Sequence, residues 1–310
     1  MRTLICGSMA YDNIMVFQGH FSDQIMPDQI HILNVSFLVP QLRREFGGCA
    51  GNIAHNLKLL GGDPLIMATV GSDAGPYLTR LDKLGLTRTH VRQHANALTA
   101  QAFITTDLDD NQITAFHPGA MNFSHLDHVS GWMDVDLAII APDGRDGMLL
   151  HARELAAQDI PFVFDPGQGL PMFSGEELLN FVKLATYVAV NDYEGKMLEE
   201  RTGVTLDKIA EGVEALIVTR GAEGSSIFTS GQRIDIPCVK ADEILDPTGC
   251  GDAYRAGLLY GISSGLDWRK TGQIASVMGS IKIASRGGQN HVPTREEINA
   301  KYLQAFGENL

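Results

Sequence analysis

The chain has 310 residues, and 44% of them are hydrophobic, which is enough apolar material to bury a large core. Its net charge of −13 argues against a nucleic-acid partner, because binding to phosphate backbones needs a basic surface. The sequence contains neither a run of about 18 apolar residues nor a signal-peptide pattern, so we expect no membrane partner. The four cysteines have no paired spacing, which favours a cytoplasmic, reducing location over a disulfide scaffold or a zinc site.

Short apolar runs alternate with helical patterns through most of the chain. The expected strands are Thr3–Cys6, Leu65–Val70, Leu137–Ala141, Pro161–Phe164, Tyr187–Val190 and Ala215–Val218, followed by a hairpin at Ser225–Phe228 and Arg233–Ile236. The expected helices are Ala74–Leu84, Asp146–Ala157, Gly175–Leu184, Tyr193–Arg201, Gly249–Ser263, Trp268–Ala284 and Arg295–Phe306. This alternation predicts a mostly parallel sheet covered by helices on both faces. No linker suggests a second full domain, so we expect one domain over residues 1–310.

Two stretches, Asn13–Val39 and Ala100–Phe116, interrupt this alternation and have a more strand-like pattern. They predict either a small sheet that stands off the main body or an edge hairpin of the main sheet. The pattern alone favours neither.

A glycine-rich run, Gly47-Gly-Cys-Ala-Gly51, precedes a segment with apolar residues at helical spacing, which Gly61 and Gly62 end. Glycines before a helix allow a ligand to approach the backbone, and Asn52 adds a donor and an acceptor. By itself, such a turn is more often structural.

The most informative motif is Asp246-Pro-Thr-Gly-Cys-Gly-Asp252, which opens a predicted buried helix. The first N–H groups of a helix have no intrahelical partner, so Gly249, Cys250 and Gly251 are predicted to cradle an anion. Asp252 beside them is placed to take a proton from a hydroxyl. An anion-binding helix start with an adjacent base is typical of enzymes that transfer a phosphoryl group to an alcohol. The alternative is an ordinary turn and helix N-cap.

This second motif resembles the C-terminal signature of the ribokinase-like (PfkB) kinases, with Cys250 in place of an alanine. The glycine-rich run that ends at Asn52 resembles the N-terminal signature of the same family. Segments along nearly the whole chain, such as 21–30, 116–121 and 191–194, are similar to bacterial, mycobacterial-type adenosine kinases. The resemblance implies a three-layer α/β fold with a small β-sheet lid, contributed by about residues 13–39 and 100–118.

The resemblance also implies a set of substrate-binding residues. Those expected to bind the nucleoside are Ser8, Asp12, Ser36, Gly48, Asn52, Phe103, Phe116 and Gln168. The two phenylalanines would stack on a purine, although a phenylalanine in an alternating strand is more often a core residue. Asp12 would bind sugar hydroxyls, and its alternative role is that of a turn aspartate.

For ATP, the residues implied are Asn191, Thr219, Gly221, Gly224 and Gly288. Glu194 would hold Mg²⁺ through water, since Mg²⁺ takes few protein ligands and keeps several waters. On local grounds, however, Asn191 and Glu194 fit a helix cap better. A K⁺ ion would lie at Asp246 and at backbone carbonyls around Thr248.

The expected reaction is ATP-dependent phosphorylation of the 5′-hydroxyl of a nucleoside, and the resemblance to adenosine kinases implies adenosine, as in purine salvage. Asp252 would be the general base, beside the anion cradle. The alternatives are a kinase for guanosine, inosine, cytidine or a free sugar such as ribose, and a nucleoside-binding regulator without turnover. The expected partners are the nucleoside, ATP and a second copy of the chain that binds through the lid.

Overall fold

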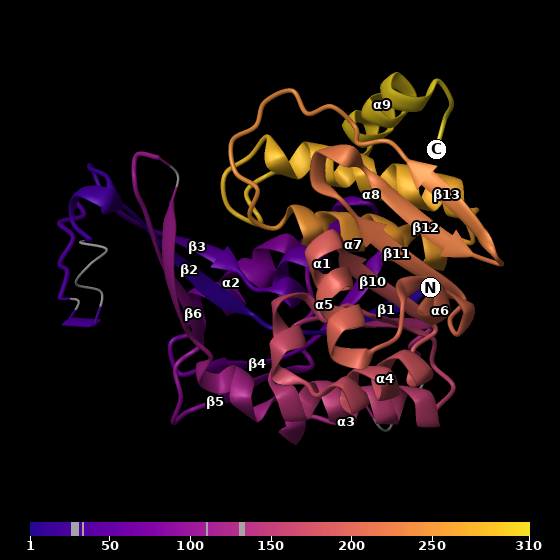
Figure 1. Cartoon of the computed structure of the whole chain (residues 1–310), viewed down its shortest axis with the longest axis horizontal. Helices are drawn as coiled ribbons and strands as arrows, with labels where there is room; N and C mark the ends of the chain where they lie inside the picture. Colours follow the sequence, from indigo (N-terminus) through magenta and orange to yellow (C-terminus); the bar gives the residue numbers. More distant parts are fainter. Residues whose placement is uncertain (26–30, 33, 110, 130–133) are drawn as a thin grey trace.

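Figure 1 shows the computed structural model of the chain, in which helices lie on both sides of a central sheet. The structure describes residues 1–25, 31–32, 34–109, 111–129 and 134–310. Part of the expected lid segment 13–39, namely residues 26–30 and 33, lies outside this description. Within the described ranges, no helix is long and apolar enough to cross a bilayer.

The main sheet is mostly parallel, as the alternating pattern predicted. Its order is β13 (Gln232–Ile236), β12 (Ser225–Thr229), β11 (Ala215–Thr219), β10 (Tyr187–Asn191), β9 (Phe162–Phe164), β8 (Leu137–Ile140), β1 (Arg2–Cys6), β4 (Asp63–Gly71) and β5 (Val91–His94). The hairpin β12–β13 adds two antiparallel strands at one edge. All four residues of β8 are buried, since helices cover both faces of the sheet.

The two faces of the sheet form separate hydrophobic cores. One core lies under α1 (Cys49–Leu59), α2 (Gly75–Leu84), α7 (Cys250–Ser263) and α8 (Trp268–Ile283). The other lies under α3 (Arg145–Ala157), α4 (Gly175–Leu184), α5 (Asp192–Thr202) and α6 (Leu206–Glu211). Alternation along β1 supplies both, because Ile5 faces the first core while Leu4 and Cys6 face the second. Helix α9 (Arg295–Phe306) packs on α8.

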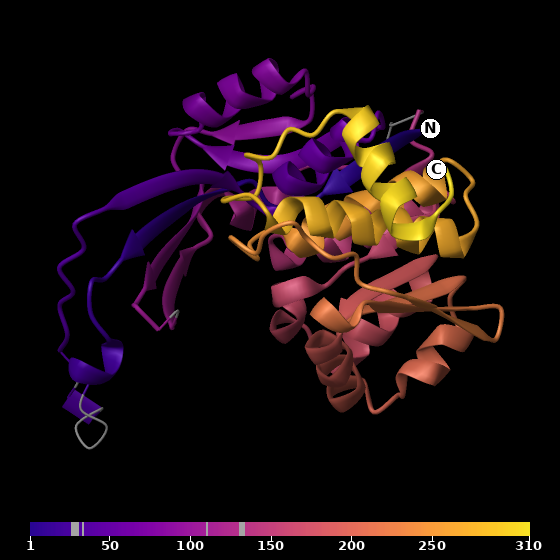
Figure 2. The same ribbon diagram turned by 90° about the horizontal axis from the view of Figure 1, so that it is seen from above.

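A small second sheet stands off the main body, so the lid interpretation is correct and the edge hairpin is not. Its order is β3 (Leu42–Gly47), β2 (Ala10–Val16), β6 (Ala100–Thr106) and β7 (Gln112–His117). Figure 2 shows these strands projecting away from the helices. Strands β2 and β6 are parallel, and the two outer pairings are antiparallel. The homodimer expected through this lid stays a prediction that sedimentation of the purified protein would test.

Three elements were not expected from the sequence: β3, β5 and α6. Strand β3 carries Arg43, Arg44 and Glu45, and it lies on an edge of the thin lid, where charged side chains reach water. It therefore lacks the apolar run that a core strand would show.

Helices α7 and α8 pack closely because of a glycine. A Cβ atom at Gly257 of α7 would lie 2.5 Å from the Cα of Ala275 in α8. We expect Gly257→Ala to lower the free energy of unfolding by about 1–3 kcal/mol, because the helices must separate. Gly279→Ala in α8 is the matched control, since its Cβ would lie 3.9 Å from the nearest atom. That change should be neutral or stabilise by up to about 1 kcal/mol. Equilibrium denaturation measures both, and equal losses would contradict the packing argument.

Candidate active site

A cavity of about 810 Å³ lies where the lid meets the start of α1 and α7. Most of the residues expected from sequence to bind substrate or carry out chemistry line it. They are Ser8, Asp12, Gly48, Asn52, Phe116, Gln168, Gly249, Gly251 and Asp252. Residues far apart in the chain thus meet at one site.

Three expected residues are not among those that line this cavity: Ser36, Phe103 and Cys250. Ser36 is exposed on the outer part of the lid. Phe103 is 41% exposed, and in the sheet register it pairs with Asn13 and Ala115. The pleat places it on the face opposite to Asp12.

The lid contributes to the cavity through one face of its strands. Asp12 pairs with Ala102, and Ala102 pairs with Phe116, so the three side chains share a face. All three line the cavity. Because Phe116 is 50% exposed, its ring is available to a flat ligand.

The cradle at the start of α7 differs in one residue from the expected one. Gly249 has a φ of 77°, a left-handed conformation that glycine adopts readily. The N–H of Cys250 donates to the carbonyl of Pro247 at 3.1 Å, so it is not free for an anion. Across the described residues, no backbone acceptor pairs with the N–H groups of Gly249, Gly251 or Asp252 outside the helix itself. An anion at this helix start would therefore find these three amides free, and not that of Cys250.

Asp252 is held by Asn52, whose Nδ2 donates to its Oδ2 at 2.8 Å. The pKa of Asp252 is raised to about 6, chiefly by burial and in smaller part by Asp165, and this value includes the opposing effects of Asn52 and Arg255. A carboxyl with a pKa near 6 is a base at neutral pH that still accepts a proton readily.

The orientation of Asn52 is fixed by a chain of buried groups. Tyr77 donates its hydroxyl to the carbonyl of Gly47 at 2.6 Å. Gln289 Nε2 donates to this hydroxyl at 2.7 Å and to Asn52 Oδ1 at 3.1 Å. Because the carbonyl of Gly47 only accepts, each donor in this series of hydrogen bonds is determined. Asn52 must accept with its oxygen, so its NH₂ group faces Asp252.

Glycines make room for this chain. A Cβ at Gly51 would lie 2.0 Å from the hydroxyl of Tyr77, and one at Gly288 would lie 2.4 Å from Asn52 Oδ1. Gly288, expected at the ATP site, thus packs directly against Asn52. Tyr77 and Gln289 were missed by the sequence analysis, although Gln289 directly follows the glycine pair at 287–288.

Asp12 is buried on the lid side of the same cavity. Burial raises its pKa to about 6, and Asp252 and Asp246 add to the shift. A Cβ at Gly47 would lie 2.3 Å from Asp12 Oδ2, so glycine is needed there. Gly48, with a φ of 87°, would place a Cβ 2.6 Å from the carbonyl of Ser8.

Ser8 and Gln168 also face the cavity, near the start of α1. The N–H of Cys49 donates to Ser8 Oγ at 3.2 Å, so this hydroxyl caps the first helical turn. Gln168 Nε2 lies 4.0 Å from the thiol of Cys49. The remaining hydrogen-bonding capacity of both side chains is open to a ligand.

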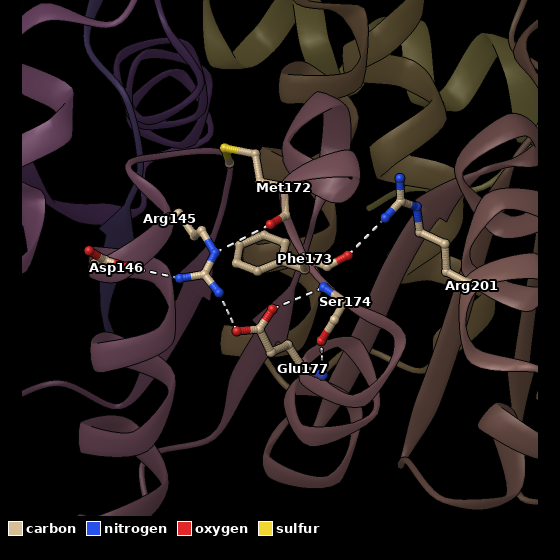
Figure 3. A network of polar contacts seen from close by, with 7 residues as sticks. All are labelled: Arg145, Asp146, Met172, Phe173, Ser174, Glu177 and Arg201. Carbon is tan, nitrogen blue, oxygen red and sulfur yellow. Dashed lines mark hydrogen bonds and ion pairs between the residues drawn. The ribbon is translucent and has the colours of Figure 1, made fainter.

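One wall of the cavity was not expected from sequence. Asp143, Arg145 and Met172 line it. Arg145 binds the carbonyl of Met172 and pairs with Asp146 and Glu177, and Glu177 caps α4 together with Ser174 (Figure 3). Asp143 and Arg145 follow β8, and Met172 comes after β9, so the ends of two parallel strands were the signal that the sequence offered.

The buried carboxyl of Asp143 is the other feature of this wall. Burial raises its pKa to about 8, although the N–H of Gly144 donates to it at 2.8 Å. Burial therefore favours the protonated form of this carboxyl, which is able to donate a hydrogen bond.

Four of the five residues expected at ATP lie at or just after the ends of neighbouring strands, and the fifth, Gly288, lies in the loop after α8. Asn191 ends β10 and pairs with Thr219, which ends β11. Gly221 and Gly224 follow in the next turn, each with positive φ. Such strand ends are the usual place for ligands in an open parallel sheet. None of these four residues lines the cavity described above.

Asn191 and Glu194 form a capping box at the start of α5, which is the alternative that the local sequence favoured. Glu194 Oε2 accepts from the N–H of Asn191 at 2.8 Å, which leaves its other oxygen for a metal-bound water. Burial raises the pKa of Glu194, and Arg255, which pairs with Asp165 at 3.0 Å, opposes this shift. A carboxylate with one free oxygen is able to bind Mg²⁺ through water.

The potassium site expected at Asp246 does not fit the structure. Both oxygens of its carboxylate accept backbone N–H groups, from Thr248 at 2.9 Å and from Gly287 at 2.8 Å. Its carbonyl accepts the ammonium of Lys282 at 2.8 Å. A cation would have to displace that ammonium.

Comparison with known proteins indicates the family to which a chain with this fold and site belongs. Residues 9–295 match the pfkB family of carbohydrate kinases. The chain belongs to the PfkB family. It is therefore a phosphotransferase that acts on a hydroxyl group, as its two glycine-rich motifs predicted.

Several relatives within the PfkB family are named nucleoside kinases. One from Methanocaldococcus jannaschii is 33% identical over 268 residues, which cover 86% of this chain and 88% of that protein. A solved structure of a Burkholderia thailandensis nucleoside kinase in complex with inosine superposes on this chain with a TM-score of 0.92. The two sequences are 56% identical, and the match covers 99% of both chains. The complex of that kinase with ADP-inosine is 57% identical, with a TM-score of 0.89, and covers 99% of this chain and 97% of that one.

Proposed function

We propose that this protein transfers the γ-phosphoryl group of ATP to the 5′-hydroxyl of a nucleoside. The observation that carries the proposal is the carboxylate of Asp252 beside free N–H groups at the start of α7, inside a cavity that also holds Asp12 and Phe116. The likeness to the Burkholderia thailandensis nucleoside kinase, whose structure contains inosine, supports a nucleoside as the acceptor.

In this mechanism, Asp252 accepts the proton of the 5′-hydroxyl as its oxygen attacks the γ-phosphorus. The amides of Gly249, Gly251 and Asp252 would stabilise the charge that gathers on the transferred group, and the partial positive charge of the helix start would add to their effect. Asn52 keeps the carboxylate in its charged, accepting form. Mg²⁺, held through water at Glu194, would neutralise phosphate charge.

The rest of the cavity would orient the nucleoside. Asp12 would accept hydrogen bonds from ribose hydroxyls, and Ser8 and Gln168 are within the same cavity. Phe116 would stack on the base. Because burial favours the protonated form of Asp143, this carboxyl would donate a hydrogen bond to an acceptor on a purine.

We propose adenosine as the nucleoside, with inosine as the second candidate, because a similar kinase structure contains inosine. A panel of adenosine, inosine, guanosine, cytidine and ribose, scored by ADP formation, tests the proposal. Turnover of ribose alone would contradict it, and binding of a nucleoside without turnover would indicate a regulator.

Replacement of the general base tests the chemical step. We expect Asp252→Asn to lower kcat by roughly 10²–10⁴, while nucleoside affinity changes only a few fold. In the parent enzyme, kcat/KM should fall as pH falls through about 6, because protonation removes the base; Asp12 titrates in the same range. Initial rates over pH 5–9 and calorimetric binding measure these effects. A kcat for the variant within tenfold of the parent would exclude this role.

Replacing each of the two lid phenylalanines distinguishes stacking on a base from simple packing within the lid. Phe116→Ala should weaken binding of a purine nucleoside by roughly 1–3 kcal/mol, because a stacked base loses its partner. Phe103→Ala is the matched control, since this residue lies on the other face of the lid and should change binding little. Calorimetry with adenosine and with ribose measures both variants. Equal losses for the two ligands, or for the two variants, would count against stacking.

The metal requirement is tested by removal and return of Mg²⁺. A chelator should abolish turnover and added Mg²⁺ should restore it, because the ion neutralises phosphate charge. Glu194→Gln should raise the Mg²⁺ concentration needed for half-maximal rate. Asp192→Asn, an exposed carboxylate in the same helical turn, should not. Full activity in the chelator would exclude a magnesium-dependent mechanism.

A further inference from the structure

Lys282, in the last turn of α8, is a lysine with no exposed surface. Its ammonium donates to the carbonyl of Asp246 at 2.8 Å and to that of Ser285 at 2.9 Å. Lysines are almost never fully buried, because an ammonium removed from water needs compensating partners. Its partners here are backbone carbonyls, with no carboxylate oxygen within ion-pair distance among the described residues.

Rings of backbone carbonyls are the ligands that potassium ions prefer in proteins, because carbonyl oxygens replace the hydration shell of the ion. An ammonium carries the same single charge and has three N–H donors for the same oxygens. The resemblance to PfkB kinases predicted K⁺ at Asp246 and the carbonyls around Thr248. The structure places the ammonium of Lys282 at the first of these carbonyls.

The position of this ammonium connects it with the anion cradle. Its two carbonyls belong to the loop before α7 and to the loop after α8. The carboxylate of Asp246 joins the same loops through the N–H groups of Thr248 and Gly287. A Cβ at Gly249 would lie 3.7 Å from Lys282 Cε, so the lysine stem runs directly below the cradle.

Burial lowers the pKa of Lys282, and the nearby Cys250, Asp246 and Asp252 oppose this shift, so they compensate part of the cost of burying the ammonium. A fixed positive charge below the cradle also attracts the negative charge that gathers on a transferred phosphoryl group.

We propose that Lys282 is a built-in monovalent cation, which organises the anion cradle so that the enzyme works without K⁺. The part of this inference that concerns turnover rests on the proposed kinase function, but the part that concerns folding does not. Lys282 acts through the two loops, so it is a positioning residue.

The first experiment compares the parent protein in KCl, NaCl and choline chloride at equal ionic strength. We expect the melting temperature to be the same in the three salts within error, and kcat to differ by no more than twofold. The reason is that the ammonium already fills the carbonyl site. A rise in Tm together with a tenfold or greater activation by K⁺ would overturn the inference.

The second experiment removes the charge. Lys282→Met keeps the length of the side chain and should lower both Tm and kcat in every salt, since the carbonyls lose their donor. We expect kcat to fall roughly tenfold or more, which is less than the 10²–10³ typical of a direct oxyanion donor. Lys270→Met is the matched control on the same helix, where the ammonium is partly exposed and pairs with Glu308. It should leave Tm and kcat close to those of the parent.

The third experiment returns a cation. Lys282→Ala leaves space at the carbonyls, so K⁺, ammonium or methylammonium should raise its Tm and restore part of its kcat, whereas choline should not. If neither Lys282 variant changes Tm or kcat, the inference is wrong while the proposed function stands. If the parent phosphorylates no nucleoside, the proposed function fails, and the Tm measurements still decide the role of Lys282.

Discussion

The hydrogen bond from Asn52 to Asp252 joins the starts of two helices that are far apart in the chain. Gly51, in the first turn of α1, leaves room for Tyr77, and Gly288, in the loop after α8, leaves room for Asn52. A methyl group at either position would clash with the groups that orient Asn52. These two glycines therefore serve the assembly of the site.

The two motifs identify the family and much of the site because their residues are contiguous. A glycine-rich turn followed by a helix fixes the positions of Asn52 and Asp252 locally, so the sequence alone places them at helix starts. Phe103 and Phe116 are different, since each lies in an alternating strand. The register between β2, β6 and β7 decides which ring faces the cavity, and no local pattern encodes that register. Lys282 resembles an ordinary lysine near a helix end, and its burial follows only from the packing of distant loops.

The site concentrates negative charge with few compensating cations. Asp12 and Asp252 each have a pKa raised to about 6, and Asp252 contributes to the shift at Asp12. Arg255 is already paired with Asp165. A neutral ligand rich in hydroxyl donors relieves this repulsion better than a carboxylate ligand would, because its hydroxyls supply hydrogen bonds without adding charge. The chemistry of the cavity thus fits a nucleoside or sugar on one side, with phosphate charge confined to the start of α7.

The lid joins the body at the base of its four strands, near Ala10, Gly47, Ala100 and His117. Ala10, Ala100 and Met121 form a small buried cluster at this junction, and the two alanines keep the backbones of the paired strands β2 and β6 close. The four strands thus leave the body along one line, which any movement of the lid would use as its hinge. Asp12 and Phe116 lie within two residues of that line. A swing of the outer lid would therefore displace these two side chains far less than it displaces the outer ends of the strands.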